Sequence, residues 1–158
     1  MPECESRYVE VCVFRFRRDA AEFLMLRRAD GEKVYPGMWQ FVTGKVRSGE
    51  TAAAAARREL REETSLEPLR FWVVPHCSTF YDPVRDAVQI VPMFAVQADA
   101  DAAPRLSPEH SAWNWVDAAE AQRRLVWPGQ RAGLAVVAAS ILGGEPAGLL
   151  GLLPGSNG

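Results

Sequence analysis

Hydrophobic and polar positions alternate along residues 7–18, as they do in a strand with one buried face. Residues 22–28 repeat the alternation after a short Asp-Ala-Ala turn, which predicts an antiparallel hairpin. A loop containing glycine and proline follows, and a short apolar stretch spans residues 39–42. Residues 51–63 consist almost entirely of Ala, Arg, Glu and Leu, which are strong helix formers, so this segment carries the clearest helix prediction in the chain.

The second half of the chain predicts further strands and two more helices. Apolar runs at residues 69–74 and 87–97 indicate strands, and Pro92 predicts an edge or a bulge in the second of them. Residues 99–109 are rich in Asp, Ala and Pro, which is typical of an exposed connection. The remaining expected elements are a short strand at 113–116, a helix at 118–125 capped by Asp117, a break at Pro128-Gly129 and a helix at 130–142.

Strands and helices mixed in this way predict an α/β protein of the α+β or layered α/β/α type. The chain has 158 residues, a length that fits one compact domain with one hydrophobic core. We expect that domain to cover residues 1–142. The tail, residues 143–158, contains so much Gly and Pro that we expect it to be loosely ordered.

Composition and charge exclude several classes of protein. Hydrophobic residues make up 48% of the chain and the formal charge is −2, so neither a disordered chain nor a polycationic binder of nucleic-acid polymers is expected. No apolar run approaches the roughly 20 residues that span a bilayer, and the acidic N-terminus lacks signal-peptide features. The three cysteines show no pattern, which predicts a reducing, cytoplasmic location.

The candidate chemistry lies on the predicted helix at residues 51–63. At 3.6 residues per turn, Glu59, Glu62 and Glu63 fall within one sector about 100° wide, beside an apolar stripe of Ala and Leu side chains. Three carboxylates at this spacing repel one another and weaken the helix unless a positive charge lies among them. A hard divalent cation with oxygen ligands, such as Mg²⁺, supplies that charge.

The same residues also allow a purely structural interpretation, in which the acids form a solvated helix face. The balancing charges would then be the arginines of the helix itself, Arg57, Arg58 and Arg61. The loop before the helix favours the metal site, because it contains Gly44 and Gly49 and its backbone carbonyls can complete the coordination of an ion.

Residues 44–66 resemble the signature of the Nudix hydrolases, Gly-x5-Glu-x7-Arg-Glu-U-x-Glu-Glu-x-Gly-U, where U is a bulky aliphatic residue. The departure is Ser65, where the family usually has a glycine after the helix end in a left-handed conformation. That change removes no metal ligand. The positions that match are Gly44, Glu50, Arg58, Glu59, Leu60, Glu62, Glu63 and Leu66.

The resemblance implies a fold and an activity. The fold is an α/β/α sandwich with a mixed central sheet, in which the signature forms a loop-helix-loop catalytic motif. The activity is hydrolysis of a nucleoside diphosphate linked to another group. The ion would be Mg²⁺, with Mn²⁺ as the alternative, held by Glu59, Glu62, Glu63 and the backbone of Gly44. Arg58 would pair with Glu50 and hold the catalytic helix in place.

Outside the signature, the chain is similar to the bacterial dihydroneopterin triphosphate pyrophosphohydrolases, which also act on dATP. The likeness covers roughly residues 7–142 and includes the stretches 39–44 and 107–117. It makes Glu109 a candidate metal ligand or general base, and an ordinary exposed loop acid is the alternative. It implies hydrolysis of a nucleoside or pterin triphosphate to the monophosphate and pyrophosphate.

The residues expected to contact substrate are Arg28, Trp39, Phe80 and Tyr81, although large aromatic side chains more often belong to a core. Dinucleoside polyphosphates and ADP-ribose stay open as substrates, as does a non-catalytic nucleotide-binding module. His76, Cys77 and His110 lack zinc-ligand spacing, so we expect satisfied structural roles for them. Oligomeric state is not predicted by the sequence.

Overall fold

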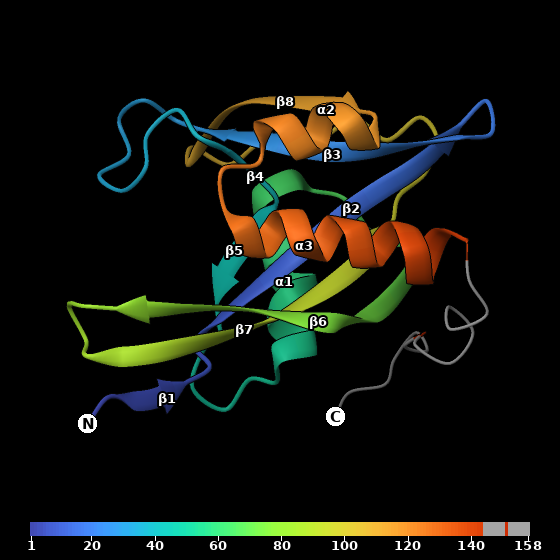
Figure 1. Ribbon diagram of the computed structural model, residues 1–158. Coiled ribbons are helices and arrows are strands. Elements are labelled where there is room, and N and C mark those ends of the chain that lie inside the picture. The colour runs from blue at the N-terminus through green and yellow to red at the C-terminus, as the bar shows by residue number, and fades with distance from the viewer. Residues whose placement is uncertain (144–150, 152–158) are drawn as a thin grey trace.

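The computed structural model describes residues 1–143 and Gly151 and shows a mixed sheet with helices on both faces (Figure 1). The strands are β1 (Glu3–Glu5), β2 (Tyr8–Arg17), β3 (Ala20–Arg28), β4 (Trp39–Gln40), β5 (Val42–Lys45), β6 (Arg70–Asp82), β7 (Ala87–Gln97) and β8 (His110–Val116). The helices are α1 (Ala52–Thr64), α2 (Ala118–Arg124) and α3 (Pro128–Val137), and a π-helical turn, Ala138–Leu142, continues α3. The prediction for the tail lies almost wholly outside the described residues.

Strand β2 is the centre of the sheet. It pairs antiparallel with β3 and β5 and parallel with β7. Strand β7 also pairs with β6 and β1, whereas β3 pairs with β4 and β8. The expected mixed sheet, and with it the predicted fold class, is confirmed.

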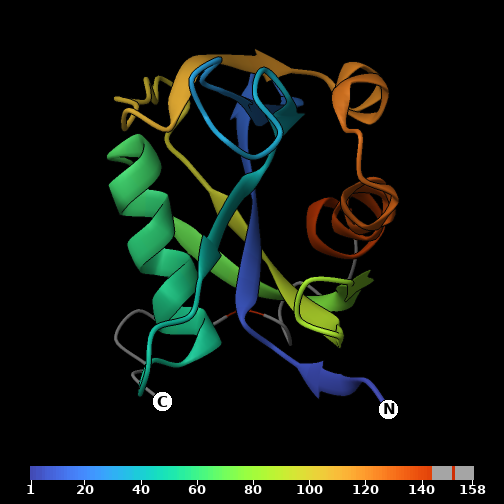
Figure 2. The same cartoon turned by 90° about the vertical axis from the view of Figure 1, so that its left-hand side faces the viewer.

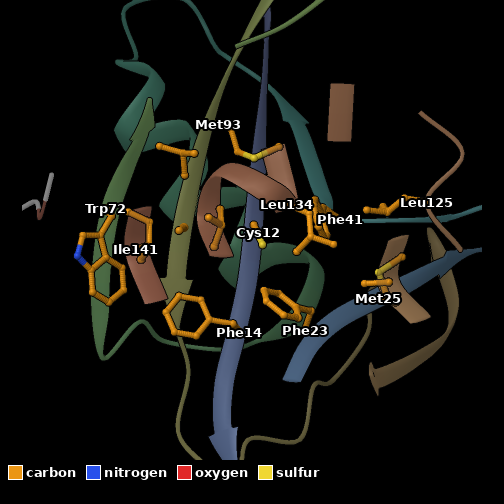
Figure 3. Packing of buried hydrophobic residues seen from close by; sticks show 14 residues of the cluster. Cys12, Phe14, Phe23, Met25, Phe41, Trp72, Met93, Leu125, Leu134 and Ile141 are labelled. Carbon is orange, nitrogen blue, oxygen red and sulfur yellow. The ribbon is translucent and has the colours of Figure 1, made fainter. Parts of the chain in front are cut away.

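Alternation along β2 divides the core into two layers. Val9, Val11 and Val13 face α1, and they pack with its buried residues Ala55 and Leu60. The intervening residues face α3 and contribute to a second cluster (Figure 3), whose labelled members include Cys12, Phe14, Phe23, Phe41, Met93 and Leu134. Figure 2 shows the sheet edge-on, with α1 on one side and α2 and α3 on the other. The sequence predicted a strand with one buried face, whereas most of β2 is buried on both faces because helices cover both sides of the sheet.

Local capping fixes the ends of α1. The Thr51 side chain accepts a hydrogen bond from the backbone N–H of Ala54 at 3.2 Å, which satisfies one free donor of the first turn. At the other end, Ser65 has a φ of 58° and its N–H donates to the carbonyl of Arg61 at 2.9 Å. The helix and its left-handed terminus therefore match the expectation from the sequence.

Several elements differ from the sequence predictions. Strand β8 begins at His110 rather than at residue 113. Strand β6 continues past the expected end at residue 74, because a register shift between Val73 and Cys77 accommodates Pro75 within the strand. The irregularity expected at Pro92 thus lies on the opposing strand. Helix α3 begins at Pro128 rather than at residue 130, since proline is well suited to the first position of a helix. Strand β1, a three-residue edge segment, was not expected.

Cys4, Cys12 and Cys77 all carry free thiols. Within the described part of the chain, no helix is both long enough and apolar enough to cross a membrane.

Candidate active site

The three helix carboxylates lie on α1 at different depths. Leu60, Ala55 and Ala56 anchor the helix on the sheet, and this fixes which side of α1 faces inward. Glu63 is 3% exposed, whereas the side chain of Glu62 is 47% exposed. The cluster therefore runs from a buried inner acid to an outer acid at the surface.

Arg58 connects this cluster to the preceding loop. Its Nε and Nη2 donate to the two carboxylate oxygens of Glu50 at 2.8 and 2.9 Å, and Nη2 also donates to the carbonyl of Lys45 at 2.8 Å. Its Nη1 donates to Glu59 Oε1 at 2.7 Å and to Glu62 Oε2 at 3.0 Å. Hydrogen bonds from Arg58 lower the pKa of Glu50 to about 2. The arrangement fastens the loop and the helix to each other.

Gly44 on β5 makes room for Glu59. A Cβ atom at position 44 would lie 2.0 Å from Glu59 Cδ, so the Glu59 side chain would have to move. The glycine is therefore required for close approach of a carboxylate to the strand backbone, and not for an unusual backbone conformation. At this close approach, the Gly44 carbonyl and the Glu59 carboxylate are candidates to ligate the same metal ion.

Glu63 is a buried carboxyl group that lacks a hydrogen-bond partner for one of its oxygens, Oε2, in the described residues. Burial is the main cause that raises its pKa well above the usual value, and the carboxylates of Glu59 and Glu109 raise it further. Arg28 and a backbone hydrogen bond with Thr43 act in the opposite direction. The carboxylates of Glu59 and Glu109 therefore lie near enough to Glu63 to act on it electrostatically.

His110 is a site residue that the sequence reasoning missed. Its Nε2 lies 3.9 Å from Glu63 Oε2, and neither ring nitrogen has a hydrogen-bond partner in the described part of the chain. The expectation of a satisfied structural histidine is therefore wrong. Burial, with a smaller contribution from Arg28, lowers its pKa to about 4, so the ring is neutral near pH 7. The available signal was its place next to Glu109, another candidate ligand.

Glu109 lies at the surface, directly before β8. Its backbone carbonyl accepts a hydrogen bond from the N–H of Ala29 at 2.9 Å, which ties this loop to the end of β3. Its carboxylate is close enough to raise the pKa of Glu63. The structure thus brings Glu109 to the helix cluster from a distant part of the sequence.

The residues present fit a hard divalent cation in charge and chemistry. All the nearby acidic donors are carboxylate oxygens, and the unpartnered Glu63 Oε2 faces a surplus of negative charge. Among the described residues, however, no three His, Cys, Asp or Glu side chains lie close enough together to hold a metal ion in their present conformations. Arginines engage Glu59 and Glu62, so both carboxylates must turn toward an ion for it to bind.

The expected substrate-contact residues lie in three different places. Arg28 lies near Glu63, and its guanidinium donates to the carbonyl of Val34 at 2.7 Å. Trp39 packs against the hydrophobic cluster on the α3 side and has the Arg124 guanidinium 4.8 Å from its ring. Phe80 and Tyr81 are exposed on the β6–β7 hairpin, whose turn lies below α3 on the side away from α1 (Figure 2).

A sheet between helices, with a glycine loop leading into a carboxylate-bearing helix, defines the class of the protein. The NUDIX domain model matches residues 6–136, and the chain belongs to this family. Nudix hydrolases generally use divalent metal ions. The predicted family is therefore confirmed.

Individual relatives cover less of the chain or show only the fold. An octanoyltransferase of Myxococcus xanthus is 36% identical over 126 residues, which are 79% of this chain and 34% of that protein. A dihydroneopterin triphosphate diphosphatase of Escherichia coli is 42% identical over 62 residues, 39% of each chain. The chain thus spans little more than a third of the length of these relatives. A crystal structure of a C. elegans Ap4A hydrolase complex has a TM-score of 0.72 at 20% identity, covering 87% of this chain and 98% of that one.

Proposed function

We propose that this protein is a Mg²⁺-dependent pyrophosphohydrolase, with Mn²⁺ as an alternative ion, that cleaves a nucleoside or pterin triphosphate to its monophosphate and pyrophosphate. The observation that supports it best is the buried Glu63 carboxylate, whose Oε2 has no hydrogen-bond partner among the described residues and whose pKa the carboxylates of Glu59 and Glu109 raise beyond the effect of burial. Such an arrangement costs stability in a protein that has no metal to bind. Among named relatives, the dihydroneopterin triphosphate diphosphatase supports the choice of substrate class.

The proposed reaction is hydrolysis of a phosphoric anhydride. The oxygen of water bonds to phosphorus, the bridging P–O bond breaks, and the bridging oxygen leaves with its electron pair on the other phosphate. One proton of the water passes to a base. A bound divalent ion neutralises phosphate charge and activates water for attack.

This chain's own residues have distinct proposed roles. Glu59, Glu62, Glu63 and the carbonyl of Gly44 would hold the ion. Arg58 would act as a positioning residue, because its bonds to Glu50 and Lys45 fix the orientation of the helix.

Two further residues would act from outside the helix. Glu109 reaches the cluster from an exposed loop, so it can exchange a proton with solvent and is the proposed base or additional ligand. Arg28, which already lies near Glu63, would contact the phosphates of the substrate.

The decisive experiment is a hydrolysis panel with product identification. The substrates are dihydroneopterin triphosphate, dATP and other nucleoside triphosphates, ADP-ribose and dinucleoside polyphosphates, each with Mg²⁺ and with a chelator. We expect pyrophosphate from a triphosphate, loss of turnover in chelator, and a drop of orders of magnitude in Glu62→Gln. Arg61→Ala is the matched control, since Arg61 is exposed on the same helix and pairs with Glu67 instead. Hydrolysis restricted to ADP-ribose or a dinucleoside polyphosphate would replace the proposed substrate.

A nucleotide-binding module without catalysis is the outcome if ligands bind but no phosphate bond breaks. Glu109→Ala with an unchanged rate and pH profile would remove Glu109 from the mechanism. We further propose that residues 1–142 form a single domain that acts in the cytoplasm on small-molecule phosphates.

A further inference from the structure

Glu62, the outer acid of the cluster, is held by a second arginine from outside α1. Arg47 Nη2 donates to Glu62 Oε1 at 3.1 Å and to Oε2 at 3.4 Å. Together with the bond from Arg58 to Oε2, both oxygens of Glu62 are engaged by cations. Glu63 differs from Glu62, because its Oε2 has no hydrogen-bond partner in the described residues.

The backbone of Arg47 is anchored although its side chain is exposed. Its N–H donates to Glu50 Oε2 at 3.0 Å, and its carbonyl accepts from the N–H of Glu50 at 3.0 Å. Glu50 is itself fixed by Arg58, so the turn that carries Arg47 is rigidly placed beside the helix. The Arg47 side chain is 63% exposed, whereas that of Arg58 is only 17% exposed.

The two arginines therefore differ in what they can do. Arg58 is held by bonds to a carbonyl and two further carboxylates, and it cannot leave the cluster without breaking them. Within the part of the chain that the structure describes, the side chain of Arg47 is hydrogen-bonded to Glu62 alone, and an exposed ion pair of this kind contributes little stability. The Arg47 side chain can therefore break its ion pair with Glu62 and change rotamer at a small cost in free energy, while its backbone stays in place.

We propose that Arg47 competes with the divalent ion for Glu62 and, once displaced, binds a phosphate of the substrate. The first half follows because a carboxylate whose two oxygens are engaged by arginines must give up part of that contact to ligate an ion. The second half follows because a freed guanidinium, on an anchored backbone next to the ion site, matches the geometry of phosphate oxygens. The inference rests on the proposed function, in which Glu62 is a ligand of the ion.

Direct Mn²⁺ binding tests the competition without any turnover. Free Mn²⁺ is measured by electron paramagnetic resonance in titrations of the wild type, Arg47→Ala and Arg61→Ala. We expect the dissociation constant of Arg47→Ala to fall about two- to fivefold, the range that an exposed ion pair contributes. Arg61→Ala should match the wild type, because Arg61 is equally exposed at 63% and pairs with Glu67, at 2.6 Å.

Pyrophosphate binding tests whether the displaced Arg47 side chain binds a phosphate. With saturating Mn²⁺, calorimetric titration with inorganic pyrophosphate should show affinity about threefold or more weaker in Arg47→Ala, with partial recovery in Arg47→Lys. For the hydrolysed triphosphate, KM should rise in Arg47→Ala while kcat stays near the wild-type value. A thermal shift in Arg47→Ala with wild-type Mn²⁺ and pyrophosphate affinities would make the ion pair purely structural and overturn the proposal.

Different results would overturn the proposed metal-dependent function and the proposed role of Arg47. Wild-type protein that binds no Mn²⁺ would overturn the proposed function and this inference with it. Wild-type protein that binds Mn²⁺, together with an Arg47→Ala variant whose dissociation constant is unchanged or higher, would overturn the inference alone.

Discussion

Replacing Glu63 by Gln should stabilise the metal-free protein and remove its response to metal. Glu63 is 3% exposed, its Oε2 lacks a hydrogen-bond partner in the described residues, and Glu59 and Glu109 add like charge. Glutamine has nearly the same shape and no charge. Its amide would occupy the place of Oε2, which lies 3.9 Å from the free Nε2 of His110, so a small movement gives it an acceptor.

The size of the effect follows from the cost of a buried polar atom without a partner. That cost is about 1–3 kcal/mol, and more for a charged group. We therefore expect the free energy of unfolding of Glu63→Gln to exceed that of the wild type by about 1–3 kcal/mol in chelator, at pH values above the folded pKa of Glu63.

The pH dependence has a definite sign. The folded pKa of Glu63 is raised, so between the ordinary value of 4.5 and the folded pKa the folded state binds more protons than the unfolded state. Wild-type stability in chelator therefore falls as pH rises through this window, and the Gln variant lacks this component. The difference between the two proteins should be small below pH 4.5 and complete above the folded pKa.

Urea unfolding followed by circular dichroism measures the effect in chelator and in millimolar Mg²⁺ or Mn²⁺. Metal should raise the free energy of unfolding of the wild type by mass action and leave that of Glu63→Gln nearly unchanged. The stability advantage of the variant should therefore shrink or reverse when metal is added. A Gln variant that is less stable than the wild type in chelator at alkaline pH would refute the reasoning, because the buried charge would then have a compensating partner.

Four further substitutions test other parts of the structure. Arg58→Ala should lower the free energy of unfolding by about 2–4 kcal/mol in urea titrations, because it leaves partly buried carboxylates without their cation. Glu10→Gln should raise stability at alkaline pH and leave it unchanged at about pH 4, since burial raises the folded pKa of Glu10. Gly44→Ala should weaken Mn²⁺ binding by displacing Glu59, from which its Cβ would lie 2.0 Å. Ser65→Gly should raise stability by about 0.5–1 kcal/mol in thermal unfolding without changing Mn²⁺ affinity, because the left-handed φ of 58° strains a serine.

Features encoded over short distances could be predicted from the sequence. The sector shared by Glu59, Glu62 and Glu63 depends only on helical periodicity, and α1 covers almost the residues expected. The left-handed conformation at Ser65 follows from its place after the helix end. The alternation at residues 7–18 predicted the strand β2, although not the burial of both its faces.

Features that depend on distant segments could not be predicted in the same way. The burial of His110 beside Glu63 requires β8 to lie next to β3, a pairing that no local pattern indicates. The ion pair between Arg47 and Glu62 depends on how the loop returns across the helix. Trp39 illustrates the same limit, because its packing against the α3-side cluster depends on the distant helix and could not be inferred from its neighbours in the sequence.

The cluster combines two kinds of electrostatic balance within one helix face. Arg58 and Arg47 neutralise the outer acids, so the fold tolerates several clustered carboxylates without a bound ion. The same protection is missing at Glu63, where a buried carboxylate meets a neutral histidine and two further acids. An arginine paired with Glu63 would stabilise the fold, but its guanidinium would occupy the proposed site of the metal ion. The unbalanced inner acid is therefore a cost in stability that is consistent with selection for binding a cation.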